Sequence, residues 1–120
     1  HVDGLTSPPD LRQIIAASHL AIVPTRSDFN EGMAMTAIEP ILLGRPVVTS
    51  AVVPASEVLA SACVLCATDD VRSFADALVA LASDHERYGR LCDACLPLSG
   101  QFFDPTKSSQ AAMQWALSKA

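Results

Sequence analysis

Two glutamates separated by seven residues, Glu31 and Glu39, are the side chains best placed in the sequence to do chemistry together. Glu31 stands in a polar segment next to Gly32, and Glu39 lies within an apolar run. A carboxylate can accept two hydrogen bonds from neighbouring hydroxyl groups of a sugar or a ribose. Glycine lets the backbone approach a ligand closely. This stretch therefore predicts a site for a ligand that carries hydroxyl groups.

The segment around these glutamates predicts a loop, a helix and a strand. Apolar residues recur at helical spacing, so we expect a helix that begins near Met33 and ends with Gly44 as its C-terminal cap. Val47–Ser50 is typical of a buried parallel strand. The helix N-terminus offers free N–H groups and partial positive charge, which favours a phosphate or diphosphate. Glu39 would lie about 9 Å further along the axis, within reach of a ribose.

The remainder of the chain alternates between predicted strands and helices. The expected strands are the end of one at 1–5, then 20–23 and 63–66. The expected helices are 8–18, a short one near 55–58, 71–82 capped by Asp69 and Asp70, one from Asp84 to Pro97, and an amphipathic one after Asp104 with Ala112, Trp115 and Ala116. This alternation predicts an α/β fold with a Rossmann-like parallel sheet and helices on both faces.

Size and charge exclude several classes of protein. A chain of 120 residues fits a single domain. Its formal net charge of −5 argues against nucleic acid and other polyanionic partners. No apolar run approaches the roughly 20 residues that a membrane-spanning helix needs, and the N-terminus lacks a signal-peptide pattern. We therefore expect a cytoplasmic protein without a transmembrane segment here, with membrane association through other segments left open.

The central stretch resembles the E-x7-E motif of retaining glycosyltransferases of the GT-B fold, in particular glycosyltransferase family 4. Residues 19–25 resemble the strand that ends in Pro-Ser before that motif, and 44–48 resemble its G-K-P-V-V. Thinner similarity runs from Val2 to Leu81, and 102–107 resemble the family's tail. The resemblance implies that 1–120 is the C-terminal nucleotide-sugar domain of such an enzyme, truncated on its N-terminal side.

The resemblance also implies a function and a set of site residues. The full-length enzyme would transfer a hexosyl group from a nucleotide-diphosphate sugar to an acceptor with retention. The implied site comprises Glu31 as the catalytic-site residue and, as donor-binding residues, Gly32, Met33, Ala34, Met35, Glu39 and Thr6. Glu31 would contact hydroxyls of the donor sugar, Glu39 the ribose, and the amides of 33–35 the diphosphate or the sugar. Similar enzymes need no bound metal, so no cofactor is expected.

Part of the implied machinery is expected outside this sequence. In the family, the Arg and Lys that hold the donor phosphates lie upstream, and the acceptor is bound by an N-terminal domain. The isolated piece is therefore expected to be inactive. Two residues depart from the family's pattern. Ala34 replaces a frequent Gly, which would crowd a nearby sugar, and Pro40 lies inside the predicted helix, where a kink would redirect Glu39.

Other interpretations of the same residues stay open. A UDP-sugar 2-epimerase would use a comparable donor site, and a non-catalytic nucleotide-binding module would use the fold alone. Arg26, in the polar loop 25–30, would meet a phosphate or be simply solvated. The two C-x-x-C pairs, Cys63/Cys66 and Cys92/Cys95, suggest a zinc site by spacing alone. A strand points residues three apart to opposite faces, so we expect no metal there and interpret all four as packing residues.

Overall fold

The structure is a computed structural model that describes residue 4 and residues 6–119. The strand end expected at 1–5 lies outside the described residues, apart from Gly4. The sheet contains β1 (Ala21–Val23), β2 (Val47–Ser50) and β3 (Cys63–Cys66) in the order β1-β2-β3. Both pairings are parallel, and Ile22, Val48 and Val64 share one register position. The three predicted strands after residue 5 are therefore confirmed, with β1 one residue shorter than expected.

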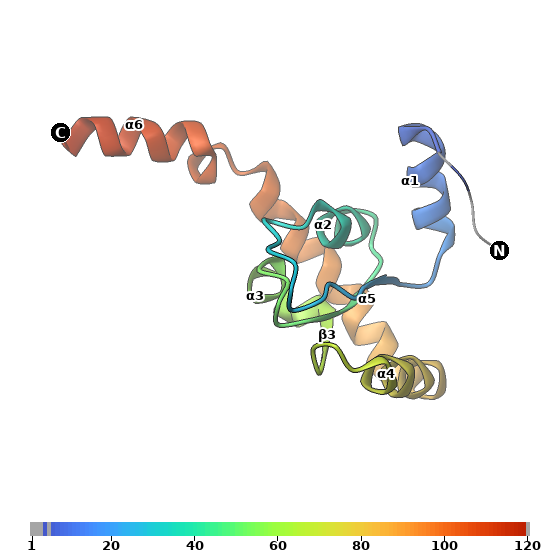
Figure 1. Cartoon of the computed structure of the whole chain (residues 1–120). Coiled ribbons are helices and arrows are strands. Elements are labelled where there is room, and N and C mark those ends of the chain that lie inside the picture. The colour runs from blue at the N-terminus through green and yellow to red at the C-terminus, as the bar shows by residue number, and fades with distance from the viewer. Residues whose placement is uncertain (1–3, 5, 120) are drawn as a thin grey trace.

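The helices lie on both faces of this sheet. The α-helices are α1 (Pro8–Ala17), α2 (Met35–Leu42), α3 (Ala55–Val58), α4 (Val71–Ser83), α5 (His85–Ser99) and α6 (Ser109–Lys119), with short 3-10 turns at Ala60–Ala62, Gly100–Phe103 and Pro105–Lys107. One buried cluster joins residues of α2, α5 and the sheet, and a second joins residues of α4, α5 and the opposite side of the sheet. Figure 1 shows α2 and α4 on opposite sides of the strands. The predicted α/β class with a covered parallel sheet is confirmed.

The end of α2 shows how a local signal fixes the path into β2. Gly44 has a left-handed φ of 73°, which glycine adopts without strain. Its N–H donates to the Ile41 carbonyl at 3.0 Å, and the Arg45 N–H donates to the Pro40 carbonyl at 2.8 Å. This is a Schellman motif, in which two otherwise free carbonyls of the last helical turn are satisfied. The predicted glycine cap is confirmed.

Two expectations about the C-terminal helices are wrong. Pro97 does not end α5, which continues to Ser99 before a 3-10 turn begins at Gly100. Pro97 is exposed, so its ring is accommodated on the surface of the helix without displacing a core residue. No described residue of α6 is buried, and its apolar side chains are spread around the helix instead of forming one face. Figure 1 shows α6 extending away from the body of the molecule.

The first helix, α1, is also attached to the body by few contacts. None of its residues is buried, and Leu11 and Ile14 are each about two-fifths exposed, at 41 % and 42 %. The guanidinium of Arg45 donates two hydrogen bonds, of 3.1 and 2.6 Å, to the Ala16 carbonyl near the end of the helix. Arg45 thus ties α1 to the loop between α2 and β2.

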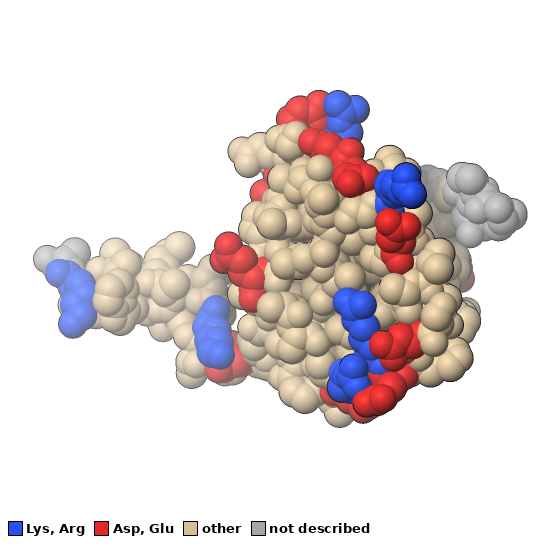
Figure 2. Space-filling model, turned by 90° about the horizontal axis from the view of Figure 1, so that it is seen from below, with Lys and Arg blue, Asp and Glu red and all other residues tan. Residues whose placement is uncertain are grey.

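The surface carries both signs of charge. On the face that Figure 2 shows, basic side chains lie beside acidic ones and do not form a separate patch. Within residue 4 and residues 6–119, every helix is too short or too polar to span a bilayer.

Candidate functional site

The N-terminus of α2 lies next to the segment that leaves β1, and it is not capped by a side chain. The helix begins at Met35, two residues later than expected. Ala34 stands at the cap position, where alanine has no oxygen to offer the first helical amides. The Ala34 side chain is only 6 % exposed and belongs to the buried cluster under α2. Its methyl group therefore packs into the core and does not project from the surface beside the helix start.

The backbone amides at this helix start are divided between bonded and free groups. The Ala34 N–H, one of the three expected to face the diphosphate, donates to the Gly32 carbonyl at 2.9 Å. The amides of Ala37 and Ile38 both donate to the Ala34 carbonyl. Within the part of the chain that the structure describes, no acceptor is found for the N–H groups of Met35 and Thr36. These two amides of the helix are available to an anion, and the Met33 N–H, just before the helix, also has no acceptor among the described residues.

Glu39 lies on the outer side of the same helix. Ala37, Ile38 and Ile41 face the core, so Glu39 points away from it, on the side it shares with Met35. Glu39 is half-buried, and no hydrogen bond or ion pair to it is found among the described residues. Because α2 begins at Met35, Glu39 is only about 6 Å along the axis from the helix start, one turn instead of the expected 9 Å. Pro40 follows it within the helix without ending it.

Glu31 is held in place by the end of β1. The Thr25 hydroxyl donates a hydrogen bond to one carboxylate oxygen of Glu31, and the other oxygen has no partner within the described part of the chain. Thr25 comes two residues after β1, and the buried Thr49 hydroxyl bonds the carbonyl of Val23, the last residue of that strand. Glu31 is thereby fixed at the carboxyl edge of the sheet, where open α/β sheets bind ligands.

Gly32 is not required by the fold itself. A Cβ atom built at this position would meet no atom within 4 Å. The space beside this backbone is thus open, as a site for close approach of a ligand requires.

Met33 and Met35, two of the predicted donor-binding residues, are 55 % and 56 % exposed and flank the start of α2. The Thr6 hydroxyl donates to the Gly4 carbonyl at 3.1 Å. Figure 1 shows α1, which Thr6 precedes by two residues, standing apart from α2 and from the segment between β1 and α2. The structure therefore does not bring Thr6 together with Glu31 and Glu39.

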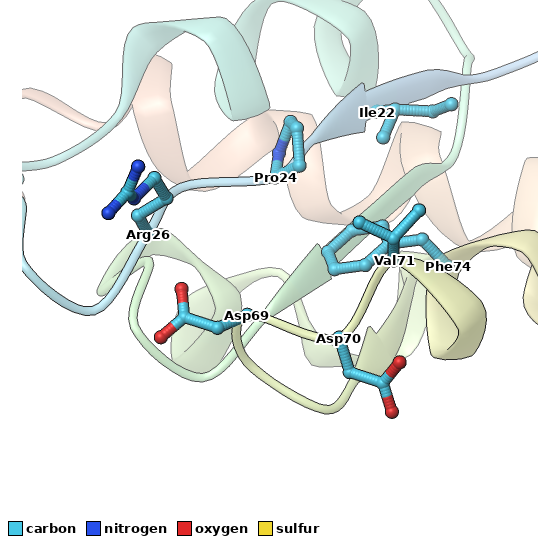
Figure 3. Close-up of a pocket in the computed structure, with 7 residues that line it drawn as sticks. All are labelled: Ile22, Pro24, Arg26, Asp69, Asp70, Val71 and Phe74. Carbon is cyan, nitrogen blue, oxygen red and sulfur yellow. The ribbon is translucent and has the colours of Figure 1, made fainter.

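A cleft of about 700 Å³ lies at the same edge of the sheet, on the side that faces α4. Its walls are apolar, and its rim is formed by Arg26 from the loop after β1 and by Asp69 and Asp70 from the turn after β3 (Figure 3). Arg26 forms an exposed ion pair with Asp28, with N to O distances of 3.1 and 2.9 Å. Its charge is thus partly balanced by its own loop, as the solvated interpretation expects.

One connection between distant segments was missed by sequence reasoning. The Asp69 carboxylate accepts hydrogen bonds from both the amide, at 3.1 Å, and the hydroxyl of Ser27. These bonds hold the pKa of Asp69 below its ordinary value of 3.8, with the Ser27 hydroxyl as the main cause. Asp69 was expected to help cap α4, but Asp70 alone performs that role, by accepting from the amides of Arg72 and Ser73. The adjacent Asp-Asp pair was the only signal in the sequence, and it indicated a cap.

Three of the four cysteines lie where the packing interpretation places them: Cys63, Cys66 and Cys95 are buried, whereas Cys92 is only partly buried and belongs to neither core cluster. Cys63 and Cys95 belong to the same buried cluster, and burial raises the pKa of each thiol to about 11. Thiols with a raised pKa are poor metal ligands and poor nucleophiles at neutral pH. Among the described residues, no group of three or more His, Cys, Asp or Glu side chains is arranged to hold a metal ion.

Comparison with known proteins identifies the family. The sequence profile described as Glycosyl transferases group 1 matches residues 1–84, out of 120 in the chain. The matched part contains the three strands, α1 to α4, Glu31 and Glu39. Searches of curated proteins and of solved structures gave no match. Since the profile covers more than half of the chain, the protein belongs to the glycosyl transferases of group 1.

Proposed function

We propose that this chain binds the nucleotide-diphosphate sugar in a glycosyl transfer that retains the anomeric configuration. The diphosphate would lie against the Met35 and Thr36 amides, where the dipole of α2 favours negative charge. Glu39 would accept hydrogen bonds from the ribose hydroxyls, one helical turn away. The free oxygen of Glu31 would accept from a hydroxyl of the donor sugar.

The proposal rests on two features of α2, its free N-terminal amides and the Glu39 carboxylate. Two amides without an acceptor and a half-buried carboxylate without a partner occupy adjacent parts of one helix, among the residues described. The first amides of a helix lack an intrahelical acceptor, and the Glu39 oxygens are not among the buried atoms without a partner, so water satisfies these groups until an anion that carries hydroxyl groups replaces it. In the transfer step, the same amides would stabilise the negative charge that develops on the departing diphosphate. The acceptor would be bound by other parts of the enzyme.

The experiment is isothermal titration calorimetry with a panel of nucleotide-diphosphate sugars and the matching nucleoside diphosphates. Glu39→Ala removes two charge-assisted hydrogen bonds to the ribose, so we expect about 100-fold weaker binding, equivalent to about 3 kcal/mol. Glu57→Gln on α3 is the matched control, because Glu57 is exposed and lies outside the proposed site. Equal affinity for Glu39→Ala and the unsubstituted chain would contradict the ribose contact.

A second substitution tests the close approach at Gly32. Gly32→Ala adds a methyl group where the fold leaves space, so the thermal midpoint should change little. Donor binding should weaken by about tenfold if the diphosphate or sugar lies against this backbone. Unchanged binding in this variant would exclude a ligand from the space beside Gly32. Retention is tested separately in the full-length enzyme, from the anomeric configuration of the product.

A further inference from the structure

The segment between β1 and α2, residues 24–34, which we call the donor loop, is tied to the body of the protein by a contact from a distant turn. Ser27, near its start, donates two hydrogen bonds to Asp69 in the turn between β3 and α4. The two residues are 42 positions apart in the sequence. β2 lies between β1 and β3 in the sheet, so this contact crosses the carboxyl end of the central strand.

Inside the donor loop, other bonds shape the segment between Ser27 and the proposed site. The Phe29 amide donates to the Arg26 carbonyl at 3.1 Å, which closes a turn around Ser27. Arg26 and Asp28 pair on either side of Ser27. Thr25, just before this turn, holds Glu31, just after it. The donor loop therefore behaves as a compact unit whose position on the sheet depends on its two ends and on Asp69.

The conformation of Asp69 makes this contact unusual. Its φ of 61° lies in the left-handed region, and it is the only such non-glycine residue among those the structure describes. Glycine and asparagine adopt this region more readily than aspartate. The backbone conformation of the turn between β3 and α4 would by itself favour glycine at this position. Binding of the Ser27 amide and hydroxyl, however, needs a side chain with acceptor oxygens.

We propose that Asp69 is a positioning residue for the donor site, holding the donor loop through Ser27 so that Glu31 and the start of α2 keep their binding geometry. This role rests on the proposed function. Asp69 touches neither the sugar nor the diphosphate in this arrangement, and it acts only through Ser27. Figure 3 shows Asp69 below Arg26 on the rim of the cleft, with its carboxylate directed toward the loop that carries Arg26.

The test compares two substitutions of Asp69 that both suit its left-handed backbone conformation. One removes the acceptor for Ser27, and the other keeps an acceptor. Asp69→Gly removes both hydrogen bonds but suits the left-handed φ, so relief of the backbone strain should offset part of the loss and the thermal midpoint should fall only slightly. The backbone amides of Ser27 and Phe29 should exchange with solvent about tenfold faster, and the donor should bind about tenfold more weakly. Asp69→Asn keeps an acceptor for the Ser27 amide and tolerates the same φ, so it should restore much of both properties.

Asp104→Gly provides the matched control. Asp104 also accepts hydrogen bonds from the amide and hydroxyl of one residue, Thr106, but it lies after α5 and outside the donor loop. The Asp104→Gly substitution should leave both the amide exchange rates in the donor loop and the affinity for the donor unchanged. Unchanged exchange and unchanged affinity in Asp69→Gly would overturn the positioning role. If the unsubstituted chain binds no nucleotide sugar, the proposed function fails, and amide exchange alone then decides whether Asp69 holds the loop.

Discussion

Replacing Pro40 by alanine should stabilise the protein, although the residue is part of the core. Proline in the interior of a helix costs about 3 kcal/mol relative to alanine, because it lacks an N–H and crowds the preceding turn. Pro40 is less than 2 % exposed, so its replacement also removes about two buried methylene groups at about 0.8 kcal/mol each. The difference leaves a gain of about 1.4 kcal/mol in the free energy of unfolding.

Pro97 provides the comparison, since it is the second proline inside a helix and is exposed. Its replacement by alanine removes no buried ring, so the gain should approach the full 3 kcal/mol or so. Urea denaturation followed by circular dichroism measures both changes, and thermal midpoints should rise by roughly 4 °C per kcal/mol. A loss of stability in Pro40→Ala beside a gain in Pro97→Ala would mean that ring packing outweighs the helix penalty. A loss in both variants would refute the reasoning.

Four further predictions concern buried groups and titration. Ser50→Ala should stabilise the protein by about 1 kcal/mol in urea denaturation, because the buried Ser50 hydroxyl has no hydrogen-bond partner among the described residues. Thr49→Val should cost about 1 kcal/mol in the same assay, because it removes the hydrogen bond between β2 and β1. The Asp69 contact is complete at neutral pH and should be lost only as the pH falls through a pKa below 3.8, which the chemical shift of the Ser27 amide reports. Because the pKa of Cys63 and Cys95 is raised from 9.0 to about 11, their contribution to stability is full below pH 9 and should be lost as the pH rises toward 11, measured as the urea midpoint.

Much of the fold could be predicted from the sequence because its signals are local. The β-branched run at Val47–Ser50 is buried throughout, as a central parallel strand requires. Asp70 and Asp84 accept hydrogen bonds from the first amides of α4 and α5, as predicted for N-terminal caps. Gly44 ends α2 because only glycine adopts its φ without cost.

Other features depend on contacts that no local pattern contains. The apolar residues of α1 follow helical spacing, yet no residue of α1 is buried against the rest of the described chain. The apolar residues of α6 are spread around the helix, and none of its described residues is buried. Pro97 is compatible with α5 because its position is exposed, which the sequence alone does not reveal.

The candidate site was predicted in its residue types but not in its details. The spacing of Glu31 and Glu39 indicated a pair of carboxylates around a helix start, and the structure puts both residues next to that start. Which amides are free depends on the bond between Ala34 and Gly32, and this bond moves the helix start to Met35. The contact between Ser27 and Asp69 joins segments 42 residues apart and could not be inferred from either segment by itself.

The central claim is that the free amides at the start of α2 bind the diphosphate of a sugar nucleotide. Nuclear magnetic resonance titration of the ¹⁵N-labelled chain with a nucleotide-diphosphate sugar tests it most directly, because each amide is observed separately. We predict that the largest saturable shifts occur at the Met35 and Thr36 amides, with smaller shifts at Gly32. Saturable shifts confined to other parts of the chain, with the amides of Met35 and Thr36 unmoved, would contradict the claim.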